Sequence, residues 1–356
     1  MSTLFLLSRK TSLHLAAVAT VALSFSGAGN ALADSAETDA RTIRWVVAHD
    51  RGSSPFLDLN KDFARRLTEK SGGKLKIEFI KSAAPESALD EDAYAQVVEG
   101  KADMSQLAAS GAKVHVFDMP FIFRNYDHAE AVFASPVGKK IVAEVAAASN
   151  GKIRGLAFTY SGGYRILVGK IALRSAADFK NARMRSSTSY LVPFMQELGA
   201  TPIDAGAPSR ERPIAGLVSG DLDLEETEIN RLAIVEKEHP DLLKQIGFVN
   251  LTRHRMYVTA IVANEKFLAS LSKKLRTLLV SEMQELAVAE RKLSIDMEGR
   301  NLDLLTKKGL HFVDYPKSEL KALMTAGEVI HAQHPEMAGL IQEIRAIKEP
   351  ARLAHN

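Results

Sequence analysis

The sequence predicts an α/β protein with two domains, and three observations support this fold class. Between residues 43 and 107, strand-like and helix-like segments alternate in a β-α-β-α-β order, which is typical of a parallel sheet covered by helices. The chain has 356 residues, enough for two hydrophobic cores. Residues 272–307 keep a helical pattern that, at about 1.5 Å per residue, spans roughly 54 Å. We expect a helix of that length to lie across both domains.

In the first half, the elements follow from the spacing of apolar residues. Residues 43–48 are a short apolar strand, and 75–80 alternate apolar and polar residues as a second strand. Residues 55–70 place apolar side chains on one helical stripe that ends before Gly72. Residues 87–100 are a second helix, and residues 102–107 a third strand.

The middle of the chain is punctuated by proline and glycine. Pro120 breaks the apolar run 117–123, which we expect to be a loop packed on the core. Pro136 interrupts a helix over 127–145. Two separate strands are expected at 153–157 and 164–168, followed by a very short strand at 182–185.

Helices and strands alternate again to the end of the chain. The glycines that follow, Gly199 and Gly220, are typical helix stops. The expected helices cover residues 189–198, 209–218, 227–238, 272–307, 318–331 and 335–347, and the expected strands cover residues 256–263 and 310–313.

Residues 1–33 have the pattern of a secretory signal. Arg9 and Lys10 precede an apolar stretch at 13–26, and Ala31-Leu32-Ala33 is a small-x-small cleavage site. An N-terminal anchor helix is the alternative. We expect an exported, periplasmic protein that is soluble, free of a membrane anchor and monomeric.

Composition excludes several classes of function. The chain has no cysteine, which excludes disulfides, thiolate metal sites, cysteine nucleophiles and the cysteine of a bacterial lipid anchor. The formal net charge is +3, of which Arg9 and Lys10 supply two, and no Lys/Arg run suggests a nucleic-acid partner.

Two arginines stand where an α/β fold places ligands. Arg185 ends the strand 182–185 and precedes a Ser/Thr-rich helix start, and Arg165 begins the strand-like run after Gly163. A guanidinium can hold a carboxylate with two parallel hydrogen bonds. By spacing alone, both could equally be ordinary surface arginines.

No catalytic or cofactor motif is assembled. The sequence lacks a Gly-x-Ser-x-Gly elbow, a His-Glu-x-x-His pair and a phosphate-binding loop, so no enzyme activity, cofactor or metal is expected. His331 and His334 lack a third ligand in the sequence. The acidic run of Glu225, Glu226 and Glu228 allows acid/base chemistry or calcium binding, or is a solvated turn before a helix.

The chain resembles the periplasmic solute-binding proteins of tripartite ATP-independent periplasmic (TRAP) transporters, of the dicarboxylate-receptor (DctP) type. The resemblance covers about residues 42–316, and seven motifs occur in the family's order. These motifs lie at residues 72–78 (GGKLKIE), 98–103 (VEGKAD), 117–123 (FDMPFIF), 163–165 (GYR), 178–185 (DFKNARMR), 198–202 (LGATP) and 215–226 (AGLVSGDLDLEE).

The resemblance implies a two-lobed periplasmic binding protein fold, each lobe a mixed sheet covered by helices, with one long helix spanning both lobes. It implies lobe I at 34–160 plus about 250–290, and lobe II at 161–249 plus about 291–356. The implied function is capture of a small organic acid between the lobes and its delivery to an ion-gradient-driven TRAP permease. A ligand-sensing protein for a signalling receptor is the alternative, and an exported acid/base enzyme is a remoter one.

The resemblance also assigns candidate ligand-binding residues. Arg185 takes the primary carboxylate contact and Arg165 a second one. Thr227, beside Glu226, stands where the family usually has asparagine. Asp92 and His49 are weaker candidates from the other lobe.

The chain departs from the family pattern in the segments that line the cleft. Pro213 stands where one family motif has a tyrosine, and residues 88–90 stand where a second family motif is expected. These departures suggest that the ligand differs from a plain dicarboxylate.

Overall fold

The computed structural model of this protein describes residues 40–47, 55–85, 88–186, 188–203 and 214–349. These residues form a two-lobed α/β fold around one mixed sheet. The sheet has nine strands in the order β2-β1-β3-β8-β4-β7-β5-β6, with β9 paired to β8 off this path. Among the described residues, no helix combines the length and the apolar character that crossing a membrane requires.

The first lobe is built on β1 (Arg41–Val47), which runs parallel to β2 (Leu75–Lys81) on one side and to β3 (Met104–Ala108) on the other. Helices α2 (Pro55–Lys70) and α3 (Leu89–Glu99) connect these strands. The predicted β-α-β-α-β unit is therefore confirmed. The bounds of α2 are those that the apolar stripe predicts.

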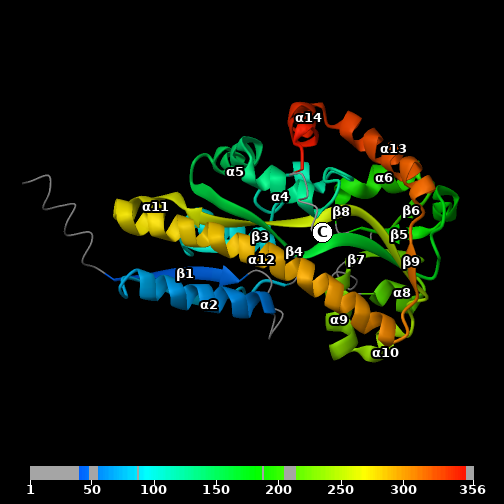
Figure 1. The fold of residues 1–356 in the computed structure, drawn as a ribbon, viewed down its shortest axis with the longest axis horizontal. Helices are drawn as coiled ribbons and strands as arrows, with labels where there is room; N and C mark the ends of the chain where they lie inside the picture. The colour runs from blue at the N-terminus through cyan, green and yellow to red at the C-terminus, as the bar shows by residue number, and fades with distance from the viewer. Residues whose placement is uncertain (1–39, 48–54, 86–87, 187, 204–213, 350–356) are drawn as a thin grey trace, which may run out of the picture.

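Two long strands join the lobes. Strands β4 (Ile153–Gly169) and β8 (Phe248–Asn264) have 17 residues each and pair antiparallel along most of their length. One end of this pair meets β3 of the first lobe, and the other end meets β7 and β9 of the second (Figure 1). The prediction of two separate strands at 153–157 and 164–168 is wrong, because both belong to β4.

A β-bulge explains why β4 stays in the sheet despite its glycine pair. The pairing register shifts between Tyr160 and Tyr164. Within this shift Gly162 and Gly163 have φ angles of +114° and +81°, which glycine adopts without a Cβ clash. The extra residues are absorbed as a bulge, and Arg165 follows it directly.

The second lobe is built on β7 (Leu224–Glu228), which lies between β4 and β5 (Arg183–Arg185). Every residue of β7 is buried. The predicted helix at 227–238 therefore starts too early: the helix α9 is Ile229–Glu238. The interpretation of the three glutamates as a solvated turn is wrong for the same reason.

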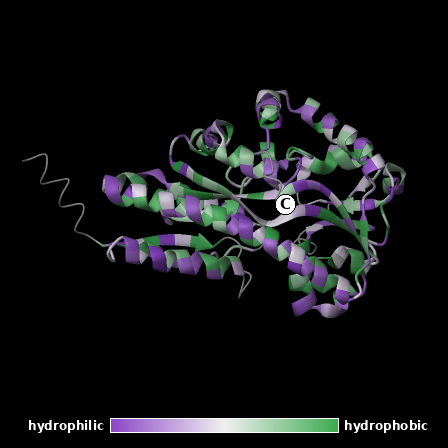
Figure 2. Cartoon of the chain, in the orientation of Figure 1, coloured by the Kyte–Doolittle hydropathy of each residue, from purple (hydrophilic) through white to green (hydrophobic). Residues whose placement is uncertain are grey.

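Helix α12 (Lys273–Lys307) confirms the predicted long helix and starts after Ser272, whose hydroxyl accepts from the Leu275 amide. It packs on α2 in the first lobe, on β4 in the middle and on α9 in the second lobe (Figure 1). In Figure 2, hydrophilic and hydrophobic residues alternate along its length, as expected for a helix with one face on the protein. A separate apolar cluster, which includes Phe117, Met184 and Phe194, combines residues of both lobes.

The other predicted helices and strands occur in the predicted order, but the strand predicted at 256–263 starts earlier, at Phe248, and short elements such as Pro240–Leu243 and Glu265–Ser270 were not predicted. The helix expected at 209–218 begins outside the described residues, and its described part, α8 (Ala215–Ser219), ends before Gly220. The other elements are η2 (Val116–Asp118), α4 (Tyr126–Ala134), α5 (Pro136–Ala148), η3 (Ala176–Phe179), η4 (Ser189–Leu191), α6 (Val192–Glu197), β6 (Thr201–Pro202), α10 (Pro240–Leu243), α11 (Glu265–Ser270), β9 (Phe312–Asp314), α13 (Lys317–Gln333), η5 (Pro335–Met337) and α14 (Ala338–Ala346).

Candidate ligand-binding site

The strand that presents Arg185 is short but well anchored. Before it, the Asp178 carboxylate accepts from the amides of Arg174 and Ser175, which fixes the turn of η3. Asn181 then adopts a left-handed φ of +63°. β5 pairs in parallel with β6 and β7, so that Arg185 ends β5 directly opposite Glu225. The predicted place of Arg185, at the end of a strand before a helix start, is confirmed.

Arg185, which is half-buried, and the buried Glu225 form an ion pair in which both side chains keep further hydrogen-bonding atoms available. The Arg185 Nη1 donates to the Glu225 Oε1 at 3.1 Å, and the side chains are 12% and 4% exposed. Among the described residues, no other partner of Arg185 is present, and the buried Glu225 Oε2 has no hydrogen-bond partner. Burial raises the pKa of Glu225 to about 7 against the opposing charges of Arg185 and Arg165 and the Ile214 amide.

All three guanidinium nitrogens of Arg165 contact acceptors on Glu226 or Glu228. Its Nη1 pairs with the Glu228 carboxylate, its Nη2 donates to the Glu226 backbone carbonyl at 3.3 Å, and its Nε lies 3.3 Å from the Glu226 Oε1. Burial opposes its charge, but the two glutamates raise the pKa of Arg165 above its ordinary value. Arg165 therefore supports the site from within the sheet.

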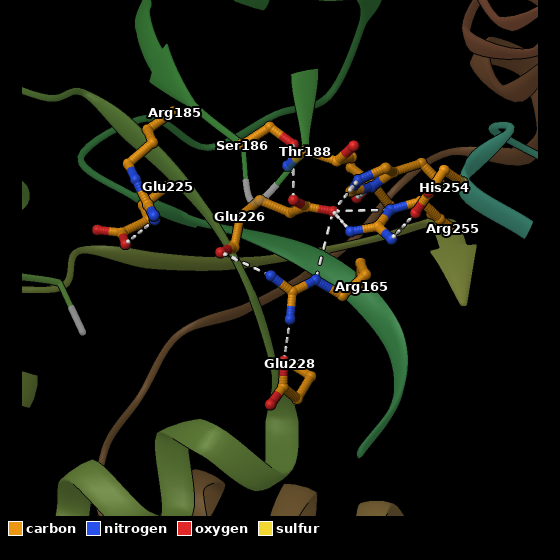
Figure 3. Close-up of polar contacts among 11 residues, drawn as sticks. Arg165, Arg185, Ser186, Thr188, Glu225, Glu226, Glu228, His254 and Arg255 are labelled. Atoms are coloured by element: carbon orange, nitrogen blue, oxygen red, sulfur yellow. Dashed lines mark hydrogen bonds and ion pairs between the residues drawn. The ribbon is translucent and has the colours of Figure 1, made fainter. Parts of the chain in front are cut away.

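Side chains from three parts of the chain contact the Glu226 carboxylate: β4, β8 and the segment directly after β5. Its Oε2 accepts from the Ser186 hydroxyl at 2.7 Å, and its Oε1 accepts from the Arg255 Nη2 at 3.0 Å (Figure 3). His254 Nε2 and Arg165 Nε each lie 3.3 Å from the same Oε1. Burial works against ionisation, but the charges of Arg255 and Arg165 and the contact with His254 keep the pKa of Glu226 well below its usual range.

The Arg185–Glu225 pair and the Arg165–Glu228 pair lie on opposite faces of β7. Side chains alternate along a strand, so that Glu225 and Thr227 share one face and Glu226 and Glu228 the other. In Figure 3 the Arg185–Glu225 pair lies to one side of β7, apart from the contacts of Glu226 and Arg165. Glu225 therefore belongs with Arg185 and does not join the Glu226 contacts.

The other predicted site residues have different positions. Thr227 is buried in β7 opposite Ile166 of β4. Asp92 lies on α3 in the first lobe, where it accepts from the Ser82 hydroxyl at 2.7 Å and the Gln96 amide at 2.6 Å. His49 lies outside the described residues. The structure thus brings Arg165, Arg185, Glu226 and Thr227 onto neighbouring strands, while Asp92 has its contacts within its own lobe.

Arg255, His254 and Asp118 complete this region and were not predicted from the sequence. Arg255 bridges Glu226 and Asp118, donating from its Nη1 to the Asp118 Oδ1 at 3.0 Å. His254 stacks on Phe194 with ring centroids 5.9 Å apart, and burial lowers its pKa. The signal was present, because residues 252–255 are polar and directly precede the apolar run 256–263.

The acidic residues and histidines do not form an ion site in the described structure. Over the described ranges, no three histidine, aspartate or glutamate side chains are grouped as metal ligands. His331 contacts the Pro120 carbonyl at 3.0 Å, and His334 contacts Glu336 at 2.9 Å.

Comparison with known proteins shows which protein family has a similar sequence. A model of the bacterial extracellular solute-binding proteins, family 7, matches residues 47–208 and 231–336. The chain is 24% identical over 296 residues to the 2,3-diketo-L-gulonate-binding periplasmic protein YiaO of Escherichia coli, a match covering 80% of this chain and 85% of that protein. It is 25% identical over 303 residues to the C4-dicarboxylate-binding periplasmic protein DctP of Rhodobacter capsulatus, covering 79% and 86% respectively.

Solved structures have the same fold. A TRAP periplasmic solute-binding protein from Citrobacter koseri with bound D-glucuronate aligns with a TM-score of 0.72 at 18% identity, covering 86% of this chain and 100% of that chain. One from Ochrobactrum anthropi aligns with a TM-score of 0.75 at 20% identity, covering 86% and 94%. The two-lobed fold is therefore confirmed by structures of distant sequence.

Proposed function

The chain belongs to the bacterial extracellular solute-binding proteins of family 7, and from that premise we propose that it binds a small organic acid and delivers it to a TRAP-type membrane permease. The proposed role is binding and release without chemical change to the ligand. The similar proteins named above are described as binding 2,3-diketo-L-gulonate, C4-dicarboxylates or D-glucuronate, all of which carry a carboxylate.

The observation that supports this proposal most is the state of Arg185. A guanidinium offers five N–H donors, and this one is 12% exposed with a single hydrogen bond to a described residue. A largely desolvated cation with spare donors is stabilised by an anion that satisfies them. A carboxylate fits, because it accepts two parallel hydrogen bonds from one guanidinium.

We assign the other predicted residues supporting roles. Arg165 and Glu226 position the ends of β4 and β7 around Arg185, and Thr227 supplies a hydroxyl on the Glu225 side of β7. Asp92 and His49 are proposed as contacts from the first lobe after closure. Such a role for Asp92 requires the lobes to approach each other.

The proposed lobe boundaries follow the strands that cross between them. Lobe I comprises residues 34–160 and about 250–290, and lobe II residues 161–249 and about 291–356. The bulge at Gly162 lies at this boundary in β4, and α12 crosses it near residue 290. We propose that ligand closes the lobes about these crossings, as paired lobes do around a shared ligand.

A periplasmic location is proposed because the chain belongs to this family. Residues 1–33 are proposed to be a cleaved secretory signal, and the mature protein a periplasmic monomer that meets its permease at the membrane surface. The relatives named above are periplasmic proteins.

A thermal-shift panel tests the function. Sugar acids, C4-dicarboxylates, keto acids and aromatic acids are each added to the purified protein. A ligand that binds only the folded state raises the apparent melting temperature. At least one acid class is expected to do so in a saturable manner, while the corresponding neutral amides do not. A panel in which no acid shifts melting contradicts the proposal.

A further inference from the structure

The pair formed by Arg185 and Glu225 presents a hydrogen-bond donor and a hydrogen-bond acceptor side by side. Only Nη1 of Arg185 contacts the carboxylate, through Oε1 at 3.1 Å. The second oxygen, Oε2, is buried and accepts no well-formed hydrogen bond from a described side chain or amide, and the Ile214 amide supplies only a weak backbone hydrogen bond to the carboxyl group. The Glu225 side chain is 4% exposed, so that water covers little of it.

A buried acceptor without a partner is costly, and a donor brought by a ligand removes that cost. A plain carboxylate brings none: on Arg185 it would place two carboxylates beside one guanidinium, which favours protonation of one of them. An acid with a hydroxyl beside its carboxylate has the complementary pair of groups. Its carboxylate meets the free donors of Arg185, and its hydroxyl donates to Glu225.

The charges around β7 also favour an acid with a hydroxyl group over a plain carboxylate. Among the described residues, the cations paired with the acidic side chains of β7 are Arg165, Arg185 and Arg255, and Arg255 also pairs with Asp118. Arg183, two residues before Arg185, is paired with Asp223. Arg165 and Arg255 are already paired with Glu226, Glu228 and Asp118. Arg185 is therefore the cation that Glu225 and the ligand must share.

Other elements do not supply a further cation to Glu225 in the part of the chain that the structure describes. α8, which packs on β7, contains no titratable residue in its sequence AGLVS. α9, which also packs on β7, carries Arg231, Glu236, Lys237 and Glu238, and none of them forms an ion pair with Glu225 in the described structure; Glu236 is paired with Lys308 at 2.6 Å.

We propose that Glu225 is a specificity-determining residue, which makes the Arg185 site select acids with a hydroxyl group next to the carboxylate over the same acids without it. This inference rests on the proposed function and names the class of acid that the site prefers. It assigns Glu225 a role that the motif comparison leaves to its neighbours Glu226 and Thr227.

Matched ligand pairs test the proposal with the full-length mature protein. D-gluconate is compared with 2-deoxy-D-gluconate, and malate with succinate, by isothermal titration calorimetry at about pH 8, above the raised pKa of about 7 of Glu225. The wild type is expected to prefer the hydroxylated member by about tenfold or more, the size expected for a hydrogen bond to a charged group.

In Glu225→Gln the preference is expected to fall to within about threefold, mainly because the non-hydroxylated acids bind more tightly. A residue with only a structural role would instead weaken both members of a pair. Glu236→Gln makes the same chemical change in the same lobe, away from Arg185, and is expected to keep the wild-type preference. Glu225→Asp, which retains the charged carboxylate that Glu225→Gln loses, is expected to keep a preference for the hydroxylated acid.

The outcomes separate this proposal from the proposed function. If acids bind but the wild type does not prefer the hydroxylated member, Glu225 does not select for it, whatever the variants do. If Glu225→Gln keeps the wild-type ratio while its circular dichroism is native, the assignment to Glu225 is overturned and the receptor function stands. If neither member of any pair binds the wild type, the proposed function itself fails.

Discussion

Arg185 and Glu225 face each other across two parallel strands and share one hydrogen bond of 3.1 Å. Two residues earlier on the same strand, Arg183 donates to both oxygens of Asp223, at 2.9 and 2.8 Å. The Arg183 side chain is 42% exposed, whereas Arg185 is 12% exposed. The more exposed Arg183 is thus satisfied by its bidentate pair, while the less exposed Arg185 retains donors that a ligand can use.

Arg165→Ala is expected to destabilise the protein more than Arg185→Ala. Removing Arg165 leaves Glu228 and Glu226 buried with less compensating charge, which costs about 3–5 kcal/mol in the free energy of unfolding. Removing Arg185 leaves Glu225, whose pKa is already about 7 and which can take up a proton. Urea denaturation followed by circular dichroism measures both.

A second substitution checks the cause. Adding Glu228→Gln to Arg165→Ala removes one of the uncompensated charges and is expected to restore part of the lost stability. Equal losses in the two arginine variants, or no recovery in the double variant, would show that Arg165 does not balance these glutamates.

Gly163→Ala is expected to be more damaging than Gly151→Ala, although both glycines have left-handed φ angles of +81° and +75°. At Gly151 an added Cβ meets nothing within 4 Å, so only the backbone strain of about 1–2 kcal/mol applies. At Gly163 the Cβ would collide with the Tyr126 hydroxyl and lie 2.6 Å from the Glu298 Oε2. That collision adds about 1–3 kcal/mol, measurable by chemical denaturation. Equal losses at the two sites would mean that the bulge is not tightly packed.

Glu290→Gln is expected to stabilise the protein at high pH. Glu290 lies on α12 with one oxygen bonded to Gln106, and burial raises its pKa to about 7 from an ordinary 4.5. Because the folded state binds this proton more tightly than the unfolded state, stability falls as pH rises from about 4.5 to about 7. The substitution removes this loss. The free energy of unfolding is therefore expected to rise by at most about 3 kcal/mol at about pH 8 and to change little at about pH 4.

Glu282→Gln on the same helix is the control with opposite sign. Burial works against the ionised form of Glu282, but Lys70 and Arg66 lie 2.6 and 2.9 Å from its oxygens and lower its pKa. The Glu282→Gln variant is expected to be less stable than the wild type at neutral pH, and this difference is expected to shrink as pH falls below about 4. Urea denaturation across this pH range distinguishes the two variants, and parallel pH profiles would contradict the assignment.

Ligand is expected to make the molecule more compact. If the lobes close on an acid held at Arg185, the radius of gyration from small-angle X-ray scattering falls when an acid from the thermal-shift panel is saturating. Arg185→Ala at the same ligand concentration is expected to keep the unliganded curve. Superimposable wild-type curves with and without ligand would argue against closure.

Much of the fold is predictable because local sequence and tertiary packing agree. The stripe of Phe63 and Leu67 specifies α2, and the proline-free run after Ser272 specifies α12. Sequence reasoning fails where burial reverses a local signal. Gly162 and Gly163 look like a strand break but form a bulge, because α12 supports them: the Gly162 amide donates to the Ser294 hydroxyl at 3.0 Å.

The site was predictable only in part. Arg185 could be assigned from its place at the end of a short strand. The acidic strand β7 could not, because three glutamates in five residues favour a solvated turn until their partners are known. Those partners, Arg165 and Arg255, come from segments about 60 and 30 residues away in sequence, and only the fold brings them to Glu226.

The account is tested most directly by calorimetric titration of an acid that stabilises the wild type into Arg185→Ala, with Arg183→Ala as the matched control from the same strand. Loss of the paired cation is expected to cost about 2–5 kcal/mol, so that the Arg185 variant binds some thirtyfold to several thousandfold more weakly. The Arg183 variant is expected to bind as the wild type does. Unchanged affinity in Arg185→Ala would contradict the claim that this guanidinium holds the ligand.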